Sequence, residues 1–282
     1  MQGGKIMANF IKKHTYILNA LLTILLYTIV QETMYFIFSF FNGAFYDNGQ
    51  LLVLLALMAA ALLCIPLYYR WYRYHIRFKK HIMIKEALSY KNVIVVCILG
   101  ITINLLIASL VEIFNVTLYF PNYNDSISIF LDGNMILSSI LVIFLAPITE
   151  ELIHRGIVYE YFKKSGNKMI ANIVQASLFA IVHGNMLQIL YSFVLGLLLG
   201  YIYEKYKSIY APILTHGFFN ATSIINSFIF SDEMANNNLI MTIVCIVSGI
   251  IFIIAYDIMK KSKTIEYIPE PGVKMITLKD LE

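Results

Sequence analysis

One apolar segment of the chain carries four ionisable side chains within six positions. Residues 145–162 read LAPITEELIHRGIVYEYF and include Glu150, Glu151, His154 and Arg155. On a helix, residues four apart share a face, so Glu151 lies beside Arg155 and Glu150 beside His154. The two adjacent glutamates then point about 100° apart. One carboxylate can pair with the arginine while the other faces a cavity and takes part in acid–base chemistry.

Two later segments carry further polar side chains at helical spacing. LFAIVHG places Phe179 four residues before His183, and LTHGFFNA places His216 four residues before Asn220. A histidine can move a proton, and histidine and asparagine N–H groups can donate hydrogen bonds to developing negative charge. The question is which elements bring these residues to the glutamates.

The composition indicates an integral membrane protein. Hydrophobic residues make up 59% of the 282 residues, charged residues make up 13%, and the mean hydropathy is +0.73. About a quarter of the residues of a soluble domain are charged. Apolar runs of about 20 residues, long enough to cross a bilayer core, predict eight transmembrane helices in an all-α, polytopic bundle. They are 15–42, 51–69, 92–114, 135–162, 169–184, 185–204, 208–230 and 238–259. Gly184 and Asn185 predict a tight hairpin between the fifth and the sixth.

The basic residues predict the orientation of the bundle. Of the 21 Lys and Arg residues, 20 lie in the terminal segments and in alternate connections, and none lies in 43–50, 115–134 or 231–237. By the positive-inside rule, both termini are then cytoplasmic. The remaining base, Arg155, lies within the fourth span. The net charge of +4 follows from this topology, so no nucleic-acid partner is expected. The oligomeric state stays open.

The chain divides by composition into three parts. Residues 1–134 hold three spans and a basic connector at 70–91, which we interpret as an amphipathic surface on anionic lipid. Residues 135–259 form the core that carries the polar motifs, and 260–282 form a cytoplasmic tail. In the sixth span, Ser192, Gly196 and Gly200 make a small-residue stripe that predicts close helix packing.

The polar residues within the spans are costly, which makes their grouping informative. A charged side chain near the bilayer centre costs about 2.5–3.5 kcal/mol on insertion scales, so such residues normally pair or face a wet cavity. Counted from the cytoplasmic basic residues at the usual helical rise, Glu150, His183 and Asn220 lie about 20–22 Å deep and His216 about 14 Å deep. They can meet in one layer. The other acids in or near spans lack such neighbours and are interpreted as structural: Glu32, Glu112 and Asp257.

Three motifs stand in order on successive predicted helices: Glu150-Glu151-x-x-x-Arg155, Phe179-x-x-x-His183 and His216-x-x-x-Asn220. This arrangement, over residues 135–230, resembles the CPBP family. That family comprises CAAX prenyl proteases of the Rce type, bacteriocin-processing enzymes and bacteriocin self-immunity proteins, and is also called the Abi family.

The resemblance implies an intramembrane endopeptidase. Hydrolysis of a peptide bond needs an activated water and donors for the oxyanion. Glu150 is the expected base and His183 shares or steers the proton of the water, while His216 and Asn220 donate to the oxyanion. These four are the predicted catalytic residues.

Three further residues are expected to support the site. Glu151 and Arg155 are interpreted as a pair that fixes the helix, with Glu151 as a second candidate for proton handling. Phe179 is expected to pack against the imidazole of His183 rather than to touch substrate.

The need for a metal stays open at this stage. Glu150, His183 and His216 are a two-histidine, one-carboxylate set of the kind that binds zinc. No His-Glu-x-x-His stretch is present, and the resemblance also permits a glutamate mechanism without metal. The metal-free reading is favoured, with no cofactor.

Two other classes of function remain open. A self-immunity protein or membrane regulator would act by binding, with the polar cluster serving only helix assembly. A transporter also places ionisable residues at mid-membrane, but no repeat between halves is visible. The expected partner is a membrane-associated peptide or protein substrate. Rich use of Ile, Asn, Lys and Tyr suggests an AT-rich bacterial genome and hence the bacterial cytoplasmic membrane.

Overall fold

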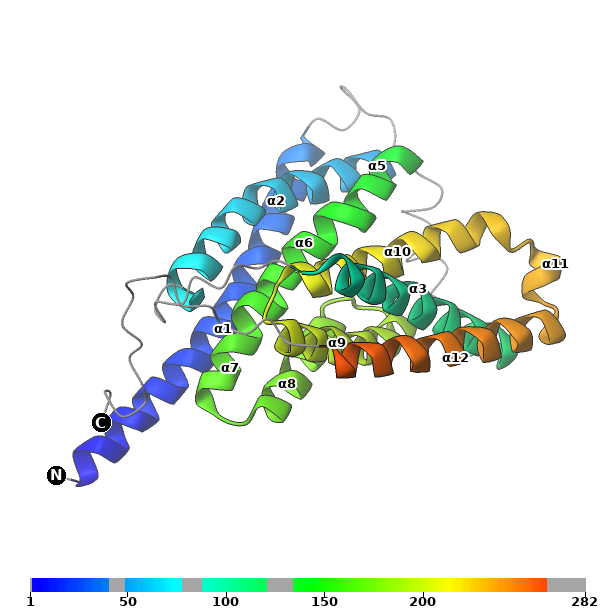
Figure 1. Ribbon diagram of the computed structural model, residues 1–282. Coiled ribbons are helices and arrows are strands. Elements are labelled where there is room, and N and C mark those ends of the chain that lie inside the picture. The colour runs from blue at the N-terminus through cyan, green and yellow to red at the C-terminus, as the bar shows by residue number, and fades with distance from the viewer. Residues whose placement is uncertain (1, 41–48, 78–87, 121–133, 263–282) are drawn as a thin grey trace.

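The computed structural model describes residues 2–40, 49–77, 88–120 and 134–262, and the described residues form helices and short connections with no strand (Figure 1). The predicted all-α, polytopic bundle is confirmed. The first three long helices are α1 (Gln2–Ser39), α2 (Gly49–Trp71), which continues into the π-helical turn η1 (Tyr72–Arg77), and α3 (Tyr90–Ile113), followed by the short 3-10 helix η3 (Val116–Tyr119).

A central helix comes next and is not uniform. It runs through α5 (Met135–Ile140), the π-helical stretch η4 (Leu141–Leu145), α6 (Ala146–Glu151), a second π-helical stretch η5 (Leu152–Tyr159) and α7 (Glu160–Ser165). The remaining helices are α8 (Lys168–Ile181), α9 (Met186–Tyr206), α10 (Tyr210–Ile229), the single turn α11 (Asp232–Ala235) and α12 (Asn238–Lys261). Each of the eight predicted spans is thus helical over most of its length.

Within the described residues, six helices are long and apolar enough to cross a membrane. Two predicted spans are not among them. Helix α8 has only 14 residues, which at the usual rise is about 21 Å, and α10 is interrupted by polar residues such as His216 and Asn220. The eight crossings and the cytoplasmic position of both termini therefore stay predictions.

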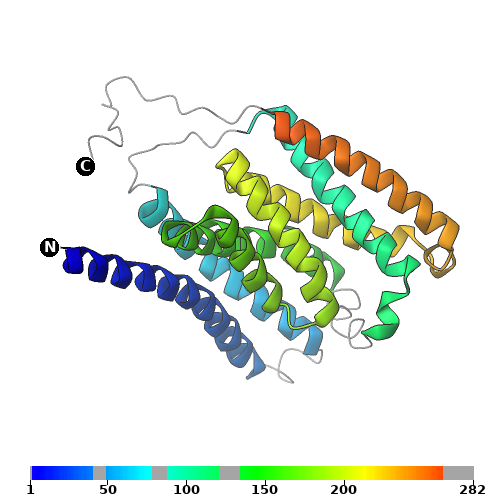
Figure 2. The same cartoon turned by 90° about the horizontal axis from the view of Figure 1, so that it is seen from below.

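The central helix lies between two groups of helices. Helices α1 and α2 pack against it on one side, and α8, α9 and α10 pack on the other, while α3 lies against α10 and α12 (Figures 1 and 2). Helices α3 and α10 approach closely because residue 100 is glycine: a Cβ there would overlap the carbonyl oxygen of Thr215. The three N-terminal helices thus pack directly on the predicted core. The predicted tail from 263 onward and residues 78–87 of the connector lie outside the described residues.

Helices α8 and α9 form the predicted hairpin. Gly184 adopts φ +73°, in the left-handed region that favours glycine. Asn185 then caps α9, because its side-chain oxygen accepts hydrogen bonds from the backbone N–H groups of Leu187 and Gln188 at 3.1 and 3.2 Å. The close packing predicted from the small-residue stripe is also present, since a Cβ on Gly196 would lie 3.0 Å from Ala176.

Basic residues from several helices gather at one end of the bundle. Glu204 of α9 pairs with Lys163 of α7 and Lys168 of α8, each at 2.8 Å, and also with Lys207. Lys205 donates to the backbone carbonyl of Lys260 at the end of α12, at 2.9 Å. This arrangement agrees with the prediction that these segments lie on one side of the membrane.

Candidate active site

Asn220 of α10 bonds to the backbone of the central helix near Pro147. Pro147 has no N–H, so carbonyls one turn earlier lack their usual helical donor. Asn220 supplies one, because its Nδ2 donates to the carbonyl oxygen of Val142 at 2.7 Å. Gly217 lets α10 approach this region, since a Cβ there would lie 2.9 Å from the carbonyl oxygen of Ile143. Asn220 is thus anchored by one of its two N–H bonds, and its side chain also reaches the wall of a cavity.

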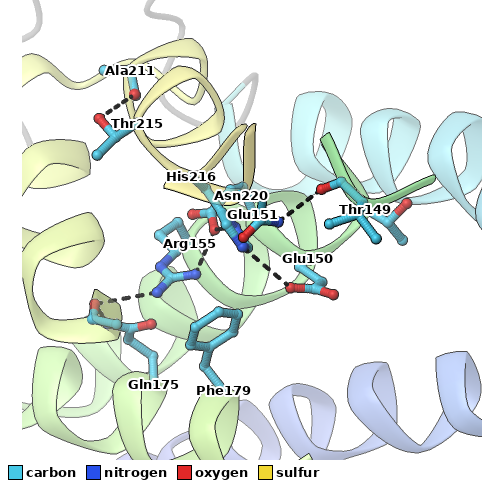
Figure 3. Close-up of polar contacts among 12 residues, drawn as sticks. Thr149, Glu150, Glu151, Arg155, Gln175, Phe179, Ala211, Thr215, His216 and Asn220 are labelled. Atoms are coloured by element: carbon cyan, nitrogen blue, oxygen red, sulfur yellow. Dashed lines mark hydrogen bonds and ion pairs between the residues drawn. The ribbon is translucent and has the colours of Figure 1, made fainter. Parts of the chain in front are cut away.

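Glu151 and Arg155 form the predicted pair, fully buried. Arg155 Nη1 donates to Glu151 Oε1 at 2.7 Å, and both side chains have no exposed surface (Figure 3). Arg155 Nη2 donates to the carbonyl oxygen of Gly196 at 3.2 Å, and the guanidinium lies 4.4 Å from the centre of the Phe179 ring. A buried charge needs such compensation. The arginine therefore ties the central helix to α8 and α9 as well as to its own glutamate.

Gln175 belongs to the same network and was not predicted from the sequence. Its Nε2 donates to the carbonyl oxygen of Gly196 at 2.9 Å, the same oxygen that accepts from Arg155. Gln175 stands four residues before Phe179 and eight before His183, so the helical spacing that linked the latter two could also have indicated it.

Glu151 also holds His216. Its Oε1 lies 2.9 Å from His216 Nδ1, across from the central helix to α10. The other ring nitrogen, Nε2, lies 3.9 Å from Glu150 Oε2. Glu151 is fully buried, whereas the side chain of Glu150 is 23% exposed. The two adjacent glutamates thus differ as the sequence predicts: one is enclosed in the structure and the other faces a cavity.

Phe179 is the centre of the aromatic contacts. It is fully buried, and its ring meets the rings of His183, His216 and His154 edge to face, with centroids 4.9, 5.6 and 5.3 Å apart. The predicted packing against His183 is confirmed, but the same ring also positions two other imidazoles and the guanidinium of Arg155. His154 was not predicted as a site residue.

His183 lies beyond the end of α8, not within the helix as predicted. The helix ends at Ile181, and His183 Nδ1 lies 2.8 Å from the carbonyl oxygen of Phe179. When Nδ1 carries the proton and donates to this carbonyl, Nε2 is unprotonated and can accept a proton. The turn therefore orients His183 with its second nitrogen free for chemistry.

The candidate catalytic residues line one cavity of about 760 Å³. Glu150, His183, His216 and Asn220 all contribute to its wall. Side chains of α1, α3, α9, α12 and the later part of α10 complete it, and several of them are amides or hydroxyls: Gln31, Ser109, Gln188, Ser192, Ser223, Asn226 and Ser227. Glu112 of α3 also lines it. Glu112 thus shares a cavity with the candidate catalytic residues, because α3 packs against α10 and brings its end to this cavity.

The three residues of the alternative zinc set, Glu150, His183 and His216, do not form a metal site in this structure. Across the described ranges, no three His, Cys, Asp or Glu side chains are grouped so that they could hold a metal ion. His216 directs Nδ1 to Glu151 and His183 directs Nδ1 to a backbone carbonyl, so each offers only Nε2. Glu150, His183 and His216 would have to move closer together to bind zinc.

The segment that carries the motifs is similar to known membrane peptidases. Residues 132–222 match the family described as Type II CAAX prenyl endopeptidase Rce1-like. This match confirms the resemblance to the CPBP family for that segment, which lies within a polytopic helical bundle. Over 91 residues, the chain is also 30% identical to a protein of Bacillus subtilis (strain 168) described as "Putative membrane peptidase YdiL".

The similarity is local. The match to the Bacillus subtilis protein covers 32% of this chain and 36% of the relative, so the chain spans about a third of the relative's length. No solved structure matches the chain. The flanking helices α1, α2 and α12 lie outside the matched segment, although side chains of all three line the cavity.

Proposed function

We propose that this protein is an intramembrane endopeptidase that hydrolyses a peptide bond of a membrane-associated peptide or protein. The observation that supports this most directly is the convergence of Glu150, His183, His216 and Asn220 on one cavity. These side chains come from three helices and supply both a base and hydrogen-bond donors. The match of the same segment to an endopeptidase family agrees with the proposal.

Glu150 acts as the general base. It is the more exposed of the two glutamates and no Lys or Arg side chain is paired with it in the described structure. Its carboxylate takes a proton from a water molecule as the water oxygen attacks the carbonyl carbon of the peptide bond. His183, held by the Phe179 carbonyl, orients the same water through Nε2. The proton on Glu150 then passes to the leaving amine, which gives a carboxylate and an amine as products.

His216 and Asn220 stabilise the oxyanion. With His216 doubly protonated, Nδ1–H donates to Glu151 and Nε2–H is free to donate to the oxyanion. Asn220 donates the second of its Nδ2 N–H bonds, because the first is used by Val142. Each donor is thereby preorganised.

Glu151 and Arg155 are positioning residues in this mechanism. Glu151 does not face the reacting groups, but it determines which nitrogen of His216 points toward Glu150. Arg155 pairs with Glu151 and connects it to the carbonyl of Gly196. The mechanism needs no metal, and we propose that the protein works without one in a bacterial cytoplasmic membrane.

The test is cleavage by purified wild-type protein and a Glu150→Gln variant. Membrane-associated peptides from cells that lack the protein serve as substrates, and products are identified by mass spectrometry. Cleavage by the wild type, lost in Glu150→Gln but kept in Glu32→Gln, supports the proposal. Glu32 is an exposed carboxylate on α1 outside the cavity. A full cellular phenotype with Glu150→Ala, inserted at normal levels, would instead favour a protein that acts by binding.

A further inference from the structure

The cavity extends well beyond the candidate catalytic residues. Gly100 of α3 contacts the backbone of Thr215 and Phe219, which flank His216 on α10. Glu112 follows 12 residues later on α3, which at the helical rise is about 18 Å farther along the axis. Phe230 and Ala235, which lie beyond the end of α10, line the cavity at this end together with Glu112. One continuous cavity therefore connects the two carboxylates Glu150 and Glu112.

Glu112 lies in a cavity wall whose basic side chains are those of His183 and His216, at the candidate catalytic end. None of the residues that line the cavity is Lys or Arg. Within the described structure, no hydrogen bond or ion pair is formed by the Glu112 carboxylate. Glu112 is near the end of α3 that is predicted to face the outside. The segments predicted to lie outside, 43–50, 115–134 and 231–237, contain no Lys or Arg either. Among the described residues, then, no Lys or Arg side chain neutralises this carboxylate.

The position of Glu112 on its helix adds to the negative potential. The residue precedes Ile113, the last residue of α3, and the C-terminal end of a helix carries a partial negative charge. Between Glu112 and the candidate catalytic residues, the wall offers hydrogen-bonding groups from Gln188, Ser223 and Asn226. Such a surface suits an extended peptide backbone that ends in a positive group.

We propose that Glu112 forms a subsite for one cationic group of the substrate, a Lys or Arg side chain or a free N-terminal ammonium. Glu112 lies about 18 Å along α3 from Gly100, which packs beside His216. An extended peptide rises about 3.3 Å per residue, so this offset places the cationic group about five residues from the cleaved bond. The register relative to the cleaved bond rests on the proposed function. The binding of a cation at Glu112 does not, because it can be measured without cleavage.

Binding is measured first, with the Glu150→Gln protein, so that peptides are retained uncut. The probes are short acetylated apolar peptides with one lysine placed at each position in turn, and matched peptides with norleucine in its place. A third set has norleucine and a free amino terminus, which separates the two sources of positive charge. The preferred lysine or ammonium peptide should bind about five- to tenfold more tightly than its neutral counterpart.

Variants of Glu112 assign this preference to the carboxylate. Glu112→Gln should abolish it, Glu112→Asp should keep part of it, and Glu112→Lys should favour a glutamate-containing peptide instead. Glu32→Gln is the matched control and should keep the full preference. Thermal unfolding of each variant shows whether it is folded, and folded Glu112→Gln that keeps the preference overturns the proposal. Equal binding of all peptides, or no binding by any, overturns it too.

Cleavage by the wild type then separates this proposal from the proposed function. Two results together support both the subsite and the endopeptidase. The wild type cleaves about five residues from the lysine, and the cleavage position no longer follows the lysine when Glu112 is replaced. A charge preference that depends on Glu112, without cleavage of any peptide, supports the subsite and contradicts the endopeptidase. Cleavage that ignores the position of the lysine supports the endopeptidase and overturns the subsite.

Discussion

Glu151 Oε1 lies 2.9 Å from His216 Nδ1, and this contact connects the central helix to α10 across the site. The same oxygen accepts from Arg155 at 2.7 Å. One buried carboxylate oxygen thus orients an imidazole and neutralises a guanidinium. The adjacent Glu150 is left to face the cavity, 3.9 Å from the other nitrogen of His216. The division of labour between two neighbouring glutamates is the basis of the predictions below.

The first prediction concerns the orientation of His216. Glu151→Gln keeps a side chain of similar shape but removes the carboxylate that faces His216 Nδ1. We expect the variant to fold and its kcat to fall about 10- to 100-fold with little change in KM, because the loss is felt mainly in the transition state. Steady-state kinetics on the purified variant measure this. An unchanged kcat would show that Glu151 does not act through His216.

The second prediction concerns Arg155. Arg155→Ala leaves the buried carboxylate of Glu151 without its cation, which should cost about 3–5 kcal/mol of stability. The matched control is Lys261→Ala, which breaks a pair of the same four-residue spacing, Asp257 with Lys261, whose side chains are 52% and 74% exposed. That control should show little loss. Protein level in the membrane and unfolding in detergent provide the comparison, and equal stability of both variants would contradict a structural role for the buried pair.

The third prediction tests Asn220 as an oxyanion donor. Asn220→Ala should lower turnover about 100- to 1000-fold and leave substrate binding nearly unchanged. Asn172→Ala is the control, since Asn172 of α8 also donates its Nδ2 to a backbone carbonyl of another helix, that of Leu197 at 3.0 Å, but does not line the cavity. Turnover close to that of the wild type in Asn220→Ala would remove this residue from the oxyanion role.

The fourth prediction separates a metal-free site from a zinc site. Chelation should leave wild-type cleavage intact, and Asn220→Ala should lose activity without any change in bound metal. Elemental analysis of the wild type, Glu150→Gln and His216→Ala checks this. Stoichiometric zinc in the wild type, lost in both variants together with activity, would show that the residues rearrange around an ion.

The fifth prediction concerns topology. Reporter fusions at Asp47, Asp125 and Asp232 should lie outside, and fusions at Lys80 and Lys168 inside, because 20 of the 21 basic residues fall on one predicted side. Parallel fusions at several positions in each loop control for local disruption of a helix. An inside signal at Asp125 would contradict the eight-span arrangement.

Local spacing was sufficient to predict the helices and the four candidate residues that line the cavity, but not Gln175 or His154. Long apolar runs predict helices because an isolated backbone in lipid must satisfy its own hydrogen bonds. Four-residue spacing predicts the pairs Glu151–Arg155 and Phe179–His183. The first pair lies within one helix, and the second joins α8 to the turn that follows it. The Gly184–Asn185 hairpin follows from the backbone freedom of glycine and the capping oxygen of asparagine.

Contacts between helices could not be predicted in this way. The spacing showed that one of two glutamates would face a cavity, but only the packing of α10 against the central helix assigns Glu151 to His216 and leaves Glu150 open. The same packing directs Asn220 to the carbonyl of Val142 and brings Glu112 of α3 into the cavity wall. Helical periodicity states which residues share a face, whereas the rotation and approach of separate helices depend on contacts between residues far apart in the chain. The sequence by itself therefore determined the helices and the candidate residues, and only the tertiary structure decided which partner each of them meets.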